Sequence, residues 1–141
     1  TNLQAKPGWI FCMLGMNDAL RIGGKNGKTV VSNEETQRNL DFIYALSKQI
    51  CDPQWAWITP YSVKELRQDQ NKWFAQLRLK WYNADLMEIH RHLASKDGVV
   101  VDLKERFLDG DEKGLLMDDG VHASLEGHIQ IVRELVYKLT E

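Results

Sequence analysis

The sequence predicts an α/β domain in which helices pack against a parallel β-sheet. Three apolar runs without alternating polar residues, 9–14, 55–59 and 99–101, are typical of strands buried on both faces. Apolar residues at helical spacing fill the segments between and after these runs. This alternation of strands and helices is the pattern of parallel strands joined by helical crossovers.

Length and charge restrict the class of protein. The 141 residues suffice for one domain, and the formal net charge is −2. This balance does not favour nucleic acid or an anionic membrane surface as a partner, so a neutral or small substrate is expected. No run of about eighteen apolar residues predicts a membrane span, and Cys12 and Cys51 lack the spacing of a metal site. We expect no metal and no cofactor, and both a cytoplasmic and a secreted location stay open.

The first predicted helix has a start and a stop signal. Ser32 and Glu35 form a capping box, and Pro53 disfavours helical geometry in Asp52. Between these signals the apolar residues at helical spacing are Leu40, Ile43, Leu46 and Ile50.

The other segments are predicted from composition and periodicity. Residues 21–28 combine glycine with lysine, which indicates an exposed, mobile loop. Residues 63–95 are expected to form one long or broken helix. Ser124 should cap the final helix. That helix is expected to bury Ile129, Val132, Leu135, Val136 and Leu139.

A side-chain amide follows the first predicted strand, in Gly15-Met16-Asn17-Asp18. At the tip of a strand, Asn17 can donate a hydrogen bond to an oxyanion. Asn-Asp is also common in a turn that ends a strand, and such a turn would itself hold the amide in place. Gly15 would then permit close backbone approach, and Asp18 would anchor the turn through hydrogen bonds.

A carboxylate and an imidazole lie three residues apart near the other end of the chain. Asp119 and His122 flank Gly120 just before the final helix. In acyl hydrolases a histidine takes the proton from a serine hydroxyl, and a carboxylate fixes the tautomer of the histidine. The pair suits these roles. The alternative is that Asp119 starts a turn and His122 packs before a helix.

Together the two motifs resemble the SGNH hydrolases, also called GDSL esterases and lipases. The third sequence block of that family is Gly-x-Asn-Asp and its fifth is Asp-x-x-His, in the order found here. The resemblance implies a flavodoxin-like three-layer sandwich with a parallel sheet. It also implies that Asn17 is an oxyanion-hole donor and that Asp119 and His122 are the acid and base of a catalytic triad. The implied substrate is a carboxylic ester, such as an acetylated sugar or a lipid.

Two blocks of that family have no counterpart in the chain. The Gly-Asp-Ser block carries the nucleophile, and a second block supplies an oxyanion-hole glycine. The nearest string, Gly110-Asp111-Glu112, offers no hydroxyl and follows the amide motif instead of preceding it. Residues 1–141 therefore resemble a single, N-terminally incomplete SGNH domain that lacks its first two strands. We expect the strand at 9–14 to have an exposed edge that pairs with a companion N-terminal segment or with a second copy.

Other candidate residues carry weaker signals. Ser62 follows the second predicted strand and is the one serine considered as a surrogate nucleophile. His128 is expected to pack or cap within the final helix. His90 and His92 are two positions apart, so they cannot form a helical two-histidine metal site. Aromatic residues are expected in the core, with an acyl pocket as the alternative role: Trp55, Trp57, Trp73, Phe74, Trp81 and Tyr82.

Two rival functions have different consequences. A non-catalytic α/β module would keep the fold and bind a ligand or partner through the open sheet edge. A requirement for a companion N-terminal fragment would separate the hydrolase from this module. A flavodoxin-like nucleotide or phosphate binder is disfavoured, because neither Gly-x-Gly-x-x-Gly nor Gly-x-x-x-x-Gly-Lys follows a predicted strand.

Overall fold

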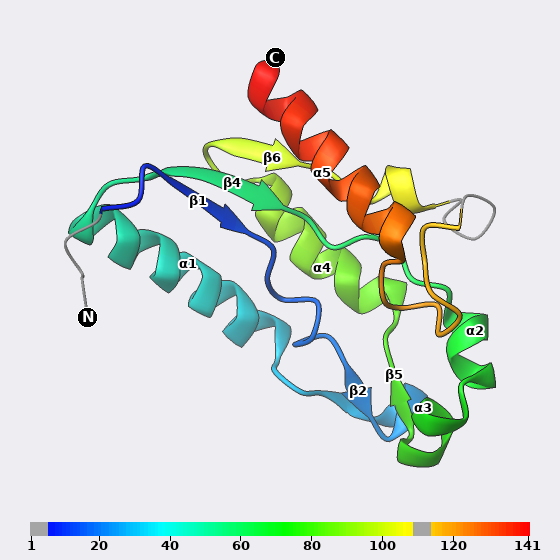
Figure 1. Ribbon diagram of the computed structural model, residues 1–141. Coiled ribbons are helices and arrows are strands. Elements are labelled where there is room, and N and C mark those ends of the chain that lie inside the picture. The colour runs from blue at the N-terminus through cyan, green and yellow to red at the C-terminus, as the bar shows by residue number, and fades with distance from the viewer. Residues whose placement is uncertain (1–5, 109–113) are drawn as a thin grey trace.

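A computed structural model describes residues 6–108 and 114–141. The main sheet consists of three parallel strands in the order β1 (Trp9–Cys12), β4 (Gln54–Ile58) and β6 (Val99–Val101). The three strands run side by side in Figure 1, and their register places Phe11 beside Ala56 and Trp57 beside Val100. The three predicted strands are confirmed, and the described chain is a mixed α/β structure with five α-helices.

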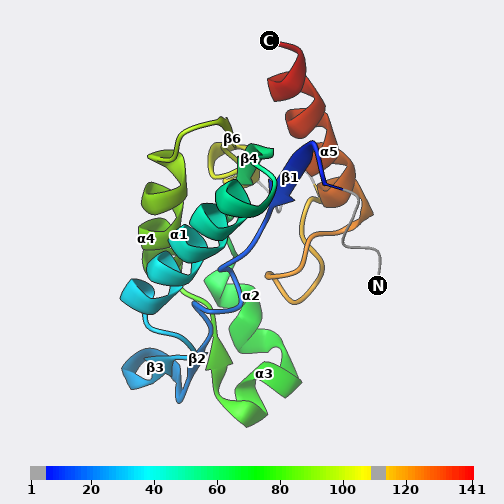
Figure 2. The same ribbon diagram turned by 90° about the vertical axis from the view of Figure 1, so that its left-hand side faces the viewer.

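Helices lie on both faces of this sheet and beyond the carboxyl ends of its strands (Figures 1 and 2). They are α1 (Asn33–Ile50), α2 (Glu65–Gln70), α3 (Lys72–Leu77), α4 (Asn83–Ala94) and α5 (Leu125–Thr140). Strand-helix-strand crossovers are right-handed, and the steps β1 to β4 and β4 to β6 run in the same direction. Helices α1 and α4 therefore lie together on one face, and α5 lies on the other.

Both predicted helix caps are present. The Ser32 side chain accepts a hydrogen bond from the Glu35 N–H at 3.2 Å and starts α1. The Ser124 side chain accepts from the Gly127 N–H at 3.1 Å and starts α5. Each serine thus satisfies a backbone donor that has no partner within its helix.

The sheet separates two apolar cores. The core under α1 and α4 contains Cys12, Leu40, Trp55, Trp57, Leu86 and Leu93. The core under α5 contains Ile58, Val101, Leu103, Phe107 and Ile131. The expected core position of most aromatic residues is confirmed. Trp73 and Tyr82 are the exceptions, because Trp73 is 64% exposed on α3 and Tyr82 is only half-buried.

A second, antiparallel sheet was not predicted. It has the order β3-β2-β5 and consists of β2 (Arg21–Ile22), β3 (Lys28–Thr29) and β5 (Leu79–Lys80). A 3-10 turn, η1 (Gly24–Asn26), joins β2 to β3. The expectation of a loop at 21–28 is therefore wrong, because strands form at both ends of this segment, whereas the expected exposure is present at Ile22, Lys25, Asn26 and Lys28. The Arg21 guanidinium bonds both carboxylate oxygens of Asp85, at 2.7 and 2.8 Å, and so ties this segment to α4.

The segment from 63 to 95 is broken into three helices and one strand. The Asn71 side chain accepts from the N–H groups of Trp73 and Phe74 and begins α3 one residue after α2 ends. Arg78 has a φ of 53° and ends α3 in the left-handed region. Strand β5 follows, so the apolar stripes of this segment belong to separate elements.

Apolar side chains along one edge of the molecule are not covered by any described residue. Strand β1 is at the edge of the main sheet, and Phe11 is 49% exposed. The burial expected along α5 is wrong for four of its residues. The main sheet ends at β1, so no further described strand lies beside it to cover them. The four residues are Ile129, Val132, Val136 and Leu139. Helix α1 also exposes Ile43, Leu46 and Ile50. We call these residues of β1, α5 and α1 the uncovered edge.

No helix within 6–108 and 114–141 combines the length and the apolar character that crossing a bilayer requires. The Gly110-Asp111-Glu112 string lies outside the described residues.

Truncation of Leu93 should destabilise the protein strongly. Leu93 is fully buried between α4 and the sheet, and Leu93→Ala should lower the free energy of unfolding by about 2–5 kcal/mol. Urea denaturation measures this change. Leu66→Ala is the matched control, because Leu66 is 80% exposed on α2, and equal losses in both variants would contradict the described core.

Candidate active site

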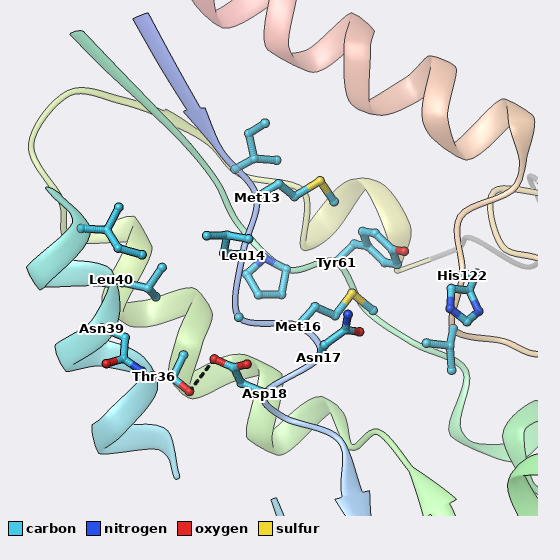
Figure 3. A pocket seen from close by; sticks show the side chains of 15 residues that line it. Met13, Leu14, Met16, Asn17, Asp18, Thr36, Asn39, Leu40, Tyr61 and His122 are labelled. Carbon is cyan, nitrogen blue, oxygen red and sulfur yellow. Dashed lines mark hydrogen bonds between the residues drawn. The ribbon is translucent and has the colours of Figure 1, made fainter. Parts of the chain in front are cut away.

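Both sequence motifs border one cavity at the carboxyl ends of β1 and β4. The cavity has a volume of about 460 Å³ (Figure 3). Its walls come from the segment after β1, from α1, from the segment after β4 and from the loop before α5. Asn17 and His122, which are distant in sequence, both line it. The carboxyl edge of a parallel sheet is where ligands bind in open α/β folds.

Asn17 lies in a tight turn after β1. The Asp18 N–H donates to the Gly15 carbonyl at 3.1 Å, and Gly15 has a φ of 98°. A Cβ at position 15 would lie 3.0 Å from a side-chain carbon of Ile89, so glycine serves both the turn and the close packing. The Asn17 side chain is exposed, and no described residue hydrogen-bonds its amide. The amide is therefore available to a ligand in the cavity.

Asp18 connects this turn to α1. Its Oδ2 accepts a hydrogen bond from the Thr36 hydroxyl at 3.0 Å (Figure 3). Thr36 is 2% exposed, and the Asp18 carbonyl also accepts from the Val31 N–H at 3.2 Å. These bonds anchor the backbone that carries Asn17.

Asp119 and His122 form a direct pair. The distance from His122 Nδ1 to Asp119 Oδ2 is 2.6 Å. The other carboxylate oxygen, Oδ1, accepts from the N–H groups of Val121 at 2.8 Å and of His122 at 3.0 Å. The turn expected of Asp119 and the pairing with His122 therefore occur together, because different oxygens serve them.

The charge state of Asp119 sets the tautomer of His122. Burial acts to raise the pKa of Asp119, but the hydrogen bonds from the His122 ring and from the Val121 and His122 N–H groups outweigh it and lower the pKa. The carboxylate is thus ionised at neutral pH and can only accept, so Nδ1 carries the proton. Nε2 of a neutral His122 then has a free lone pair, as a general base requires.

Gly120 holds the loop of this pair against the start of α2. The Lys64 N–H donates to the Gly120 carbonyl at 2.8 Å. Gly120 has a φ of 73°, and a Cβ there would lie 2.7 Å from the Lys64 carbonyl oxygen. A side chain at this position would push the loop away from α2.

Tyr61 forms an apolar wall with a polar tip. Its ring is 6% exposed and stacks on Phe107 with centroids 4.4 Å apart. Burial, together with the negative charge of Asp119, raises the pKa of Tyr61. The Tyr61 hydroxyl therefore stays protonated at neutral pH.

The cavity lacks a serine or cysteine among its lining residues. All five serines of the chain lie in the described residues. Ser62, the surrogate candidate, lines a different cavity and donates to the Lys104 carbonyl at 3.4 Å. The structure does not bring Ser62 and His122 to a common cavity. Thr36 is occupied by Asp18, so the described lining contains no free aliphatic hydroxyl.

The remaining histidines have separate surroundings. His90 Nε2 lies 3.0 Å from both carboxylate oxygens of Asp102, and His92 Nε2 lies 2.9 Å from Asp41. His128 is exposed on α5. Within the part of the chain that the structure describes, no group of three or more His, Cys, Asp or Glu residues is placed to hold a metal ion.

Two residues at the site were missed by the sequence reasoning. Thr36 carries no signal of its own within the predicted helix that starts at Ser32, and Trp81 was predicted only as a core or pocket aromatic. Both contact the turn of Asn17 from elements remote in sequence. No local pattern marks such contacts, since they depend on how the helices and strands pack.

The chain was also compared with known proteins. No protein-family model matches it, and no curated protein matches it.

Acidification should reveal the ion pair of Asp119. A carboxyl with a lowered pKa stabilises the fold above its unfolded pKa of about 3.9, and this stabilisation is lost as the pH falls through the lower folded pKa. Between about pH 5 and pH 2, the unfolding free energy of the wild type should therefore fall more than that of Asp119→Asn. Urea titrations across this range measure the difference.

Asp118→Asn is the matched control, because Asp118 is the exposed neighbour of Asp119. This variant should follow the wild type. An identical acid dependence of Asp119→Asn and the wild type would show that the pair with His122 does not form in solution.

Proposed function

We propose that this protein is an ester hydrolase of the SGNH type, with the flavodoxin-like fold of that family. One observation carries the proposal: an ionised Asp119 orients His122 at 2.6 Å, and His122 lines the same cavity as the free amide of Asn17. A base and an oxyanion donor on one cavity are two of the three functions that acyl transfer needs.

The proposed roles follow the geometry of each group. His122 Nε2 takes the proton of a serine hydroxyl as the serine oxygen attacks the ester carbonyl carbon. Asn17 donates to the carbonyl oxygen as that oxygen becomes negative, and Asp119 stabilises the protonated imidazole. His122 then returns the proton to the leaving alcohol. Water releases the acyl group in the same way, which restores the serine.

The nucleophile is proposed to come from a polypeptide segment outside these 141 residues. The described cavity lining contains no serine or cysteine, and the uncovered edge runs along β1 toward that cavity. A strand that added to β1 in the parallel sense would end at the same edge of the sheet as Cys12. Its following residue would then reach the cavity of Asn17 and His122.

A second copy of this chain fits that requirement less well than a companion segment. Pairing of two β1 strands by two-fold symmetry is antiparallel. The carboxyl end of the partner strand would then lie at the opposite end of the sheet, away from His122. The uncovered edge therefore favours a companion segment with a parallel strand over self-association.

The proposed substrate is a small carboxylic ester, such as an acetylated sugar or a lipid-like ester. Met13, Leu14 and Ile43 give the cavity apolar walls, and Asn17 and His122 supply polar groups. A cavity of this kind suits a short acyl chain next to a polar reacting centre.

The second candidate is a non-catalytic binding module of the same fold. The absence of a serine or cysteine from the described lining favours it, and the uncovered edge would be its binding surface. It predicts no turnover under any condition, so the activity measurements below separate the two candidates.

Substitution of the base and of the oxyanion donor should affect turnover differently from stability. In hydrolysis of a short-chain 4-nitrophenyl ester, His122→Ala should lower kcat by about 10²–10⁴-fold and Asn17→Ala by about 10²–10³-fold. Both side chains are exposed, so urea denaturation should show changes of about 0.5 kcal/mol or less.

His128→Ala is the control for loss of a histidine and should keep wild-type turnover. Unchanged turnover in His122→Ala would contradict the assignment of His122 as the base of a catalytic triad. A collapse of stability in Asn17→Ala would instead assign that residue to the turn alone.

The location of the nucleophile can be read directly with a fluorophosphonate, which phosphonylates an activated serine. The protein is purified from its source, its polypeptides are identified by intact mass, and peptide mass spectrometry locates the label. We expect the label in a Gly-Asp-Ser segment outside residues 1–141 and no label in His122→Ala. A label on one of the five serines of this chain would contradict the companion segment. Neither label nor ester turnover would contradict the hydrolase.

A further inference from the structure

One buried side chain contacts both halves of the candidate site. Trp81 directly follows β5 and is 5% exposed. Its indole N–H donates to the Met16 carbonyl at 3.0 Å, next to Asn17. Its ring lies edge-on against the ring of His122, with centroids 6.5 Å apart and planes inclined by 71°. Trp81 thus contacts both the turn that carries Asn17 and the ring of His122.

Trp81 is itself held from both sides of its backbone. The Gln68 Oε1 accepts from the Trp81 N–H at 2.8 Å, and the Gln68 Nε2 donates to the Trp81 carbonyl at 3.0 Å. Gln68 lies on α2 and is 1% exposed. Phe74 packs on the indole with centroids 5.4 Å apart. A buried amide with both polar atoms bonded to one residue fixes that residue firmly.

The same part of the chain holds the loop of His122. The residue before α2, Lys64, donates its N–H to the Gly120 carbonyl at 2.8 Å. The segment from Lys64 to Trp81 therefore reaches the base loop at its start and the donor turn at its end. These contacts make one continuous segment, which contains α2, α3 and β5, responsible for the relative position of Asn17 and His122.

We propose that Trp81 is a positioning residue that fixes the Asn17 amide and the His122 ring relative to each other. This inference rests on the proposed hydrolase function. Trp81 touches neither substrate nor reacting atoms. It acts through the Met16 carbonyl on Asn17 and through ring contact on His122. A misplacement of about 1 Å at a reacting centre can cost about 10²-fold in rate, so loss of this contact should appear in kcat.

Trp81→Phe tests the inference, with Trp57→Phe as its matched control. Each substitution deletes a buried indole N–H that donates to a backbone carbonyl: Met16 for Trp81 at 3.0 Å, and Asp97 for Trp57 at 3.1 Å. Trp57 is fully buried and pairs with a carbonyl at the other end of β4 from the cavity. The two variants should lose similar stability, so a difference between them reports on the site.

The first readout is the NMR spectrum of this chain, which requires no nucleophile. In Trp81→Phe, the Asn17 side-chain amide and the His122 ring resonances should shift, whereas Trp57→Phe should leave both in place. In the active protein, Trp81→Phe should lower kcat by about tenfold or more with KM changed less than about twofold. Trp57→Phe should keep wild-type values.

Unchanged Asn17 and His122 resonances in a folded Trp81→Phe variant would overturn the positioning role. If Trp81→Phe does not fold, benzothienylalanine at position 81 keeps the bicyclic shape and removes only the N–H donor, and the same shifts are expected. Failure of the proposed function has a different signature, because wild-type protein would then show no turnover and no fluorophosphonate label.

Discussion

The described structure depends on β4, the one strand of the main sheet with a neighbour on each side. All of its residues after Gln54 are buried, on both faces of the sheet. Trp55 and Trp57 stack with centroids 4.5 Å apart under α1 and α4, and Ile58 faces the core under α5. Both cores therefore meet at this strand. The residue after it, Thr59, is fully buried and accepts from the Leu103 N–H at 3.0 Å, which ties the ends of β4 and β6 together.

The site follows from the direction of the strands. Parallel strands bring their carboxyl ends to one edge, so the segments after β1 and β4 converge there although about forty residues separate them in the chain. The loop that carries His122 lies near the other end of the sequence. The residue before α2 hydrogen-bonds this loop, and the Trp81 ring packs against His122. Neither the donor nor the base is positioned by its own segment alone. Contacts between segments set the geometry that the chemistry needs.

Sequence reasoning succeeded where the signal was local. The caps at Ser32 and Ser124, the three parallel strands and the pairing of Asp119 with His122 depend on residues within a few positions of each other. It failed where partners were remote. Arg21 bonds Asp85 across 64 positions, and β2 pairs with β5, so a glycine-rich segment becomes part of a sheet through partners remote in the sequence. Helical spacing correctly predicted α5, but not which of its apolar residues would be buried, because burial depends on neighbours.

Trp81 and Thr36 show the same limit at the candidate site. Composition assigned Trp81 to the core, which is correct, but its indole N–H also serves the Met16 carbonyl. Thr36 lies one turn inside α1, and only the packing of α1 beside the first strand brings it to Asp18. Hydrogen bonds from side chains to groups that are distant in the chain produce no periodic pattern in the sequence.

Helix α5 buries few of its own side chains, and this lowers the free energy needed to detach it. Only Gly127 and Ile131 of this helix are buried. Its detachment would uncover the core beneath it but would leave the core under α1 and α4 in place, so it costs less than unfolding the strands around β4. His122 lies three residues before α5, whereas Asn17 is tied to α1 and to Trp81. The base and the oxyanion donor thus belong to units with different opening free energies. Any element that covers α5 would raise the opening free energy of the base loop without touching the base itself.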